Sequence, residues 1–125
     1  MLVTSRETRR WIIPKGWPIR GLTAHASAAR EALEEAGLIG QVDRRPIGSY
    51  RYRKRLADGS AVLCKVQVFT LRVIKQLPSW PEQAERSTRW FSPEAAAKTV
   101  DERELGGLIR DLRPHLLKAR RKLDR

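Results

Sequence analysis

The sequence predicts an α/β fold in a single domain that covers residues 1–125. The stretch Ala24–Ala36 is rich in Ala, Leu and Glu, which favours a helix. Residues 61–74 alternate between apolar and polar side chains over their first half, as in a half-buried strand. The Ser-Pro-Glu run at 92–94 supplies a helix cap, a first-turn proline and an acidic residue, so a second helix should begin there.

Local signals bound the elements of the first third of the chain. Residues 9–14 read as an apolar strand that ends at Pro14. Thr23 can cap the start of the first helix, and Gly37 fits the left-handed conformation that ends many helices. Between strand and helix the chain carries three residues that break regular structure: Gly16, Pro18 and Gly21.

The remaining elements follow the first helix without a long linker. Residues 41–55 should be extended, and Asp58-Gly59 is a hairpin turn signal before the strand at 61–74. Pro114 should start or kink a final basic helical segment at about 113–125. Because no linker separates these elements, we expect one domain.

Composition narrows the class of protein. The 125 residues include 26 Lys and Arg against 14 Asp and Glu, and the resulting net charge of +12 favours anionic partners. No apolar stretch approaches the roughly 20 residues that span a bilayer, so we expect a cytoplasmic protein without membrane association. The single cysteine, Cys64, excludes an internal disulfide and lies in an apolar strand, where a buried thiol is expected.

Three carboxylates share one turn of the first predicted helix. Glu31, Glu34 and Glu35 stand at i, i+3 and i+4, so their side chains lie on one face. Like charges so close repel one another unless a cation lies among them. The run therefore predicts a divalent-metal site, whereas the alternative is a solvated, salt-bridged helix face.

The same run resembles the motif of the Nudix hydrolases, G-x5-E-x7-R-E-U-x-E-E-x-G-U, in which U is aliphatic. The matching positions are Gly16, Arg30, Glu31, Glu34, Glu35, Gly37 and Leu38, with Ala32 as a small substitute for an aliphatic residue. Leu22 departs from the motif, because the family usually has Glu there. Residues 11–16 and 90–94 also resemble segments of the family, so the similarity spans most of the chain.

The resemblance implies a Nudix-type α/β/α sandwich with a mixed β-sheet. In that family another strand normally precedes the segment that resembles residues 2–6, so we expect the usual first strand to be lacking. A strand left uncovered in this way would expose unpaired backbone groups, which makes a homodimer through strand pairing an expectation.

The resemblance also implies metal-dependent hydrolysis of a phosphoanhydride. Glu34 and Glu35 are then the main metal ligands, and Glu31 is a further ligand or the base that activates water. Oxygen ligands favour Mg²⁺ or Mn²⁺ over zinc. Arg30 would orient Glu34 by an i, i+4 ion pair. The carbonyl of Gly16 and a carboxylate from a later loop, Glu82 or Glu85, are the further candidate ligands.

The substrate expected from this resemblance is a polyanionic phosphorylated small molecule. The chain looks most like the diphosphoinositol polyphosphate and diadenosine polyphosphate hydrolases. Trp17 could stack on a base. The cations expected to bind phosphates are Arg6, Arg9, Arg10, Lys15, Arg20, Arg51, Arg53 and Lys54. Two alternatives stay open: an enzyme that removes pyrophosphate from RNA 5′ ends, and a weak or inactive Nudix-fold module that binds nucleic acid or polyphosphate.

Overall fold

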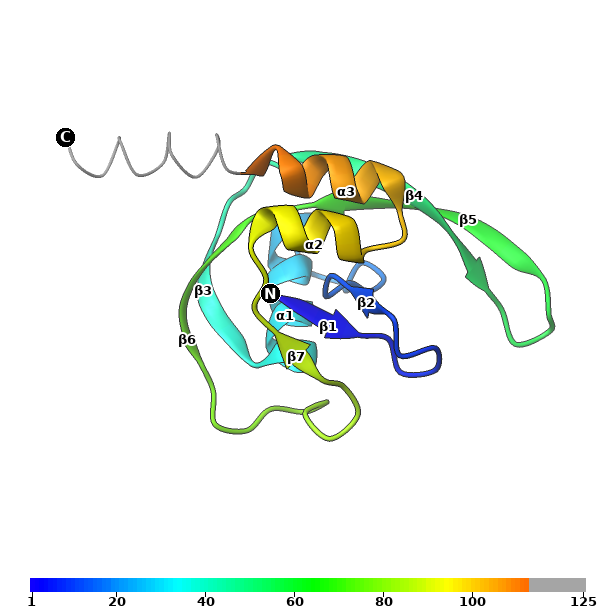
Figure 1. The fold of residues 1–125 in the computed structure, drawn as a ribbon. Helices are drawn as coiled ribbons and strands as arrows, with labels where there is room; N and C mark the ends of the chain where they lie inside the picture. The colour runs from blue at the N-terminus through cyan, green and yellow to red at the C-terminus, as the bar shows by residue number, and fades with distance from the viewer. Residues whose placement is uncertain (113–125) are drawn as a thin grey trace.

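The computed structural model describes residues 1–112, and the predicted basic segment at about 113–125 lies outside the described residues. The strands are β1 (Leu2–Thr4), β2 (Trp11–Ile12), β3 (Leu38–Val42), β4 (Gly48–Arg55), β5 (Ala61–Val68), β6 (Leu71–Gln76) and β7 (Thr88–Arg89), and the helices are α1 (Ala24–Ala36), α2 (Pro93–Thr99) and α3 (Arg103–Arg110) (Figure 1). This order of elements confirms the predicted α/β class. Within residues 1–112 the strands pair antiparallel in three sheets, ordered β2-β1-β7, β3-β6 and β4-β5, where a single mixed sheet was expected.

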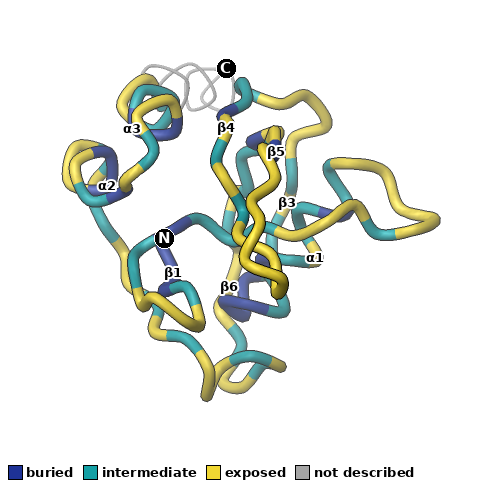
Figure 2. The backbone as a smooth tube through the Cα atoms, turned by 90° about the vertical axis from the view of Figure 1, so that its right-hand side faces the viewer, coloured by how far each residue is buried: buried dark blue, intermediate teal, exposed yellow. Residues whose placement is uncertain are grey.

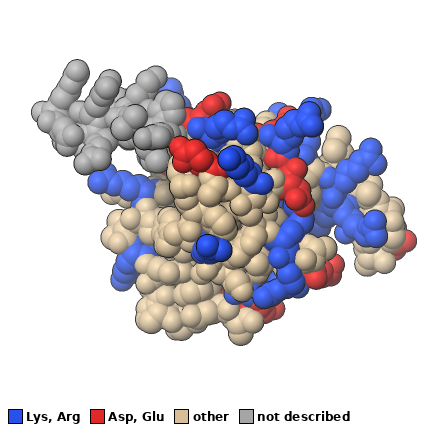
Figure 3. All heavy atoms as spheres, in the orientation of Figure 1, with Lys and Arg blue, Asp and Glu red and all other residues tan. Residues whose placement is uncertain are grey.

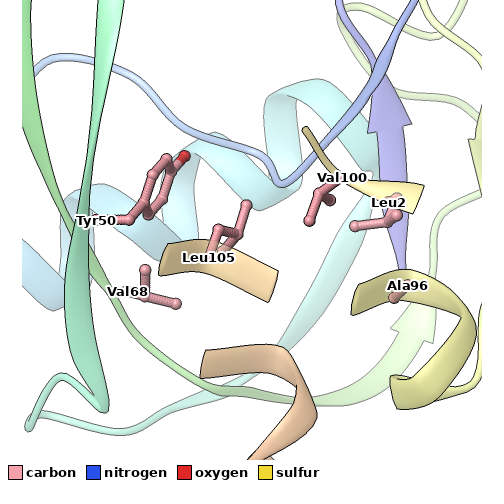
Figure 4. Packing of buried hydrophobic residues seen from close by; sticks show 6 residues of the cluster. All are labelled: Leu2, Tyr50, Val68, Ala96, Val100 and Leu105. Carbon is pink, nitrogen blue, oxygen red and sulfur yellow. The ribbon is translucent and has the colours of Figure 1, made fainter. Parts of the chain in front are cut away.

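Strand β1 lies between two apolar clusters, one on each of its faces. Leu2 packs with Tyr50, Val68 and Leu105 in a cluster completed by α2 and α3 (Figure 4). Val3, the next residue, packs in a second cluster with residues from α1, β2 and β3. Successive side chains of a strand point to opposite faces, so β1 serves both clusters. Figure 2 shows the result, with α2 and α3 on one side of the strands and α1 on the other.

The pairing of β1 corrects one expectation from the sequence. An uncovered strand was expected near residues 2–6, yet β1 is the central strand of its sheet and pairs with β2 on one side and β7 on the other. The bare backbone groups that suggested a strand-mediated homodimer are therefore not found on β1. The dimer stays a prediction without that support.

Helix α1 has both predicted caps. The Thr23 side chain accepts a hydrogen bond from the backbone N–H of Ala26, and Gly37 adopts φ 69°, the left-handed conformation. Residues 76–82, far along the chain, donate hydrogen bonds to the C-terminal end of α1. Three of its last carbonyls accept hydrogen bonds from that segment: that of Glu34 from the Glu82 N–H (3.0 Å), that of Glu35 from Trp80 Nε1 (3.2 Å) and that of Ala36 from Gln76 Nε2 (3.0 Å).

The predicted hairpin is confirmed and protrudes from the body of the domain (Figure 1). Strands β4 and β5 pair along their full lengths around the turn at Asp58-Gly59, where Gly59 has φ 88°. The predicted strand at 61–74 is divided into β5 and β6, because the chain leaves β4 after Val68 and pairs next with β3. Cys64 is buried in β5, as expected.

Candidate active site

Glu35 is the most buried carboxylate of the predicted site. Its side chain is 2% exposed, and Oε1 lies 3.1 Å from Nη2 of Arg86. Its other oxygen, Oε2, accepts a hydrogen bond of 3.0 Å from the backbone N–H of Lys15. Burial raises the pKa of Glu35 from 4.5 to about 8, Arg86 opposes the rise, and Glu31 adds to it. This carboxyl group therefore joins α1 to the loop that follows β2.

Glu31 lies beside Glu35 and directly against Gly16. A Cβ atom built on Gly16 would come within 2.5 Å of the Glu31 carboxyl carbon, so any larger residue would displace this carboxyl group from its present position. Burial raises the pKa of Glu31, whereas its hydrogen bond with Glu35 lowers it, and the nearby charge of Glu34 raises it again. The two carboxyl groups thus share a site in which full ionisation of both is unfavourable without a cation.

Glu34 does not share the contacts of Glu31 and Glu35, because it pairs with Arg30. Its carboxylate lies 3.4 Å from Nε of Arg30 in the predicted i, i+4 ion pair, with both side chains partly exposed. Residues 1–112 hold no group of three or more His, Cys, Asp and Glu side chains that could ligate a metal ion together. The three motif carboxylates are therefore not gathered around one point in this structure, although they occupy one turn of α1.

The two later glutamates expected near the site differ in position. The Glu82 carboxylate accepts from Arg86 Nε at 3.1 Å, and it therefore neighbours Glu35 through a shared guanidinium. Glu85 lies farther out, 3.7 Å from Nη1 of Arg6, which also contacts Glu82 at 3.9 Å. Of these two candidate ligands, Glu82 lies beside the carboxyl pair of Glu31 and Glu35, and Arg6, from the segment between β1 and β2, pairs with both Glu82 and Glu85.

A largely apolar cavity of about 590 Å³ opens beside Glu31. Lys15, Trp17 and Lys54 are among the residues that line it. Nζ of Lys15 lies 4.5 Å from the ring centroid of Tyr52, another lining residue, and burial lowers the pKa of Lys15. The cavity therefore presents cationic and aromatic groups next to a carboxyl group of α1.

The other predicted phosphate-binding cations are placed elsewhere. Arg10 is engaged by Glu102, with Nη1 2.6 Å from Oε1. Arg9 donates from Nη1 to the carbonyl of Glu85 at 2.9 Å. Arg20 is exposed and is not among the residues that line the cavity.

On β4, side chains alternate between two faces. Tyr52 and Lys54 line the cavity, whereas Arg51 and Arg53 occupy the opposite face, where Arg51 pairs with Glu104 of α3 at 3.4 Å. Figure 3 shows Lys and Arg atoms gathered over the protruding end of this hairpin. The structure thus brings Lys15, Lys54 and Trp17 to the cavity and leaves Arg51 and Arg53 outside it.

Leu22, the departure from the motif, is 44% exposed in the loop before α1. Its backbone N–H donates to the carbonyl of Ile19 at 3.0 Å, so the backbone of the loop forms a turn there. An apolar side chain at this position contributes no carboxylate to the cluster at Glu31 and Glu35. The substitution leaves the caps of α1 intact.

Sequence reasoning missed two residues that position the site. Arg86 is 9% exposed, bridges Glu35 and Glu82, and donates from Nη1 to the carbonyl of Thr4 at 3.1 Å. Trp80 packs so closely over Gly37 that a Cβ atom there would lie 2.4 Å from its ring. Neither residue stands at helical spacing from the motif, so the only sequence signal was a cation following Glu82 at i+4.

Comparison with known proteins gives the same family as the motif. The NUDIX domain model matches residues 1–112. Similar proteins of Arabidopsis thaliana include "Nudix hydrolase 12, mitochondrial", 32% identical over 99 residues, and "Nudix hydrolase 13, mitochondrial", 32% identical over 101 residues. Each alignment covers 77% of this chain, and the covered shares of those relatives are 49% and 50%. The chain therefore spans about half the length of the curated relatives it matches.

Proposed function

The chain belongs to the Nudix family, and we propose that it hydrolyses a phosphoanhydride bond in a highly phosphorylated small molecule. The observation that carries this proposal is the pair of neighbouring carboxyl groups, Glu31 and Glu35, held between α1 and the backbone of Lys15 and Gly16. Two acids kept together at a cost in electrostatic free energy indicate a site that a cation completes.

Nudix hydrolases generally need a divalent metal ion, and the oxygen donors of this site match one once Glu34 turns from Arg30 towards Glu31 and Glu35. The lack of a side chain on Gly16 lets the Glu31 carboxyl group lie against the backbone that would supply a carbonyl ligand, and the donors are oxygens, which suit Mg²⁺ or Mn²⁺. Glu31, Glu34, Glu35 and the Gly16 carbonyl would hold the ion, with Glu82 as a further ligand. When bound, the ion offsets negative charge on the phosphate oxygens and on the leaving group.

Residues of the chain would perform the other functions that hydrolysis requires. Water attacks phosphorus and its proton passes to a carboxylate oxygen of Glu31 while the bridging P–O bond breaks. The bridging oxygen departs with the bonding electron pair as part of the phosphate leaving group. The ammonium group of Lys15 lines the same cavity and can offset charge on the phosphate chain. Arg86 acts through Glu35, whose carboxyl group it holds in place.

The expected substrates remain those of the resemblance, a diadenosine polyphosphate or a diphosphoinositol polyphosphate. The net charge of the chain, +12, supports a polyanionic substrate. No helix within residues 1–112 is long and apolar enough to cross a membrane. A cytoplasmic location stays a prediction, and several relatives are mitochondrial by name.

A substrate panel tests the proposal. The 125-residue chain is incubated with Mg²⁺ or Mn²⁺ and a dinucleoside polyphosphate, an inositol pyrophosphate, a nucleoside triphosphate or triphosphorylated RNA. We expect metal-dependent phosphate release that EDTA abolishes. Glu31→Gln should lower kcat by about 10²- to 10⁴-fold, since it removes the base. Glu7→Gln, an exposed change outside the site, is the matched control. Absence of turnover on every substrate would refute the proposal.

The second candidate is a binding module without turnover. Its support is that Glu34 pairs with Arg30 and that Leu22 stands where the motif has Glu. Such a module would bind polyphosphate or nucleic acid with an affinity that falls steeply with salt. Salt-dependent binding without phosphate release in Mg²⁺ or Mn²⁺ would favour it over the enzyme.

A further inference from the structure

The protruding hairpin of β4 and β5 lies in a strongly basic part of the chain. Residues 44–81 contain nine Lys and Arg and a single acid, Asp58. The carboxylate of Asp58 is engaged within its own turn, where Oδ1 accepts hydrogen bonds from Oγ of Ser60 at 2.6 Å and from the backbone N–H of Ser60 at 2.9 Å. The hairpin therefore carries a local excess of positive charge.

Four cations lie on one face of this hairpin, which we call the outer hairpin face. Arg51, Arg53 and Arg55 stand at alternate positions of β4 and are exposed, so their side chains share a face. Lys65 of β5 stands directly across from Arg51 and is also exposed, although its residue reaches the border of the cavity as well. The three arginines are not among the residues that line the cavity, so this face is separate from the site of the proposed hydrolysis.

The outer hairpin face keeps like charges close together. Cations directly opposite one another in a strand pair destabilise that pair. Arg51 is partly offset by Glu104 of α3, with 3.4 Å between Nε and Oε1. Within residues 1–112, Arg53, Arg55 and Lys65 make no ion pair. An anionic partner would relieve this repulsion.

The composition of this face favours nucleic acid over an acidic protein. The core of a protein interface is depleted of charged residues and enriched in aromatic ones. Here Leu63, directly across from Arg53, is the large apolar side chain exposed among the cations. The aromatic residues of the hairpin, Tyr50 and Tyr52, lie on the opposite face, so unpaired bases would find no ring on which to stack. The face suits the backbone of a duplex, in which the bases already stack on one another.

The dimensions of the hairpin agree with this partner. Alternate residues of an antiparallel strand are about 7 Å apart, so the three arginines span about 14 Å. One strand of a DNA duplex carries about four phosphates over that length of the helix axis. The major groove, about 12 Å wide, admits a two-stranded β-ribbon. The hairpin can therefore bring several guanidinium groups to one duplex, and each guanidinium can bind a phosphate through two parallel hydrogen bonds.

We propose that the outer hairpin face binds duplex DNA through its phosphates. Contacts to phosphates carry no base information, so this binding does not depend on sequence. The duplex lies against Arg53, Arg55 and Lys65, while Arg51 stays tied to α3 through Glu104. This role goes beyond the proposed hydrolysis, because the face contributes no group to the carboxyl pair and its binding requires no metal ion.

Fluorescence anisotropy with a labelled duplex of about 20 base pairs measures this binding, in EDTA and from about 50 to 200 mM salt. The double variant Arg53→Gln/Arg55→Gln loses two phosphate contacts, so its slope of log Kd against log salt should be lower by about 1.8. The rise in Kd over this salt range should then be about tenfold smaller than for wild type. The charge-matched control, Arg44→Gln/Arg45→Gln, removes two exposed cations outside the hairpin and should keep the wild-type slope.

A single change on the other strand, Lys65→Gln, should lower the slope by about half as much as the hairpin double variant. Equal slopes for the two double variants would show that net charge alone attracts the duplex and would overturn the proposal, as would a lack of wild-type binding at the lowest salt. Poly-glutamate that displaces the duplex at equal charge, with the same dependence on Arg53 and Arg55, would assign the face to an acidic protein instead. Each readout is binding in EDTA, so failure here leaves the proposed hydrolysis untouched.

Discussion

Helix α1 makes two ion pairs that differ in burial. The Arg30–Glu34 pair lies within the helix, with side chains 57% and 38% exposed, whereas the Glu35–Arg86 pair joins the helix to a loop, with side chains 2% and 9% exposed. Exposed pairs contribute roughly 0–1 kcal/mol to stability, but removal of one partner from a buried pair costs about 3–5 kcal/mol. The comparison indicates that the Nudix motif supplies the carboxylates and that the segment around Arg86 holds one of them in place.

The largest expected effect breaks the buried pair. Arg86→Gln leaves Glu35 and Glu82 without their shared cation and removes the donor to the Thr4 carbonyl. We expect the free energy of unfolding to fall by about 3–5 kcal/mol in urea denaturation at pH 9, where the Glu35 carboxyl group is ionised in the folded protein. Arg86→Lys keeps the charge and should lose less. A loss below about 1 kcal/mol for Arg86→Gln would mean that the pair does not fix α1.

A smaller change should disturb the carboxyl groups without unfolding the protein. Gly16→Ala places a Cβ atom 2.5 Å from the Glu31 carboxyl carbon, which is the end of a flexible side chain and can move aside. We expect kcat to fall by about 10- to 100-fold, because a misplaced catalytic group is costly, while the Tm changes little. Gly107→Ala is the matched control, since its Cβ would meet no atom within 4 Å. Equal activities for the two variants would contradict this reading.

The raised pKa of Glu35 predicts a pH dependence of stability in metal-free protein. Below pH 4.5 the carboxyl group is protonated in both the folded and the unfolded state. Between 4.5 and about 8 the unfolded state loses this proton while the folded state keeps it, so stability falls as the pH rises.

The measurement is the difference in unfolding free energy between wild type and Glu35→Gln, with EDTA, at pH 5, 6.5 and 8. Gln cannot ionise, so the variant provides the baseline for all other titrating groups. We expect wild type to lose stability relative to Glu35→Gln across this range. If this difference in unfolding free energy stays constant, or grows in favour of wild type, burial does not raise the pKa of Glu35.

The smallest expected effect breaks the exposed pair. Arg30→Ala removes the i, i+4 partner of Glu34 and should lower stability by only about 0.3–0.5 kcal/mol. Urea denaturation in low and high salt measures it, because screening should reduce even this difference. A loss comparable to that of Arg86→Gln would remove the contrast between the two pairs.

The features predicted correctly from sequence are local ones. Thr23 and Gly37 fix the ends of α1 through contacts within a few residues, and the spacing of Arg30 and Glu34 is a property of any helix. The roles of Arg86 and Trp80 depend on a segment about 50 residues farther along the chain, and no periodicity encodes that contact. The faces of β4 are a related case: alternation gives two faces, but only tertiary packing decides that Tyr52 and Lys54 border the cavity and that Arg51 and Arg53 lie on the other face. Substrate binding by Arg51 and Arg53 stays a prediction.

The hydrogen bonds at the C-terminal end of α1 have a consequence for how the domain opens. The carbonyls of Glu34, Glu35 and Ala36 accept from donors in residues 76–82, so the last turn of the helix cannot fray without releasing that segment. Amide hydrogens in this turn and the N–H of Glu82 should therefore exchange with solvent in one cooperative opening event. The end of the helix and residues 76–82 form a single unit of local unfolding. Opening of this unit also disrupts the carboxyl pair of Glu31 and Glu35.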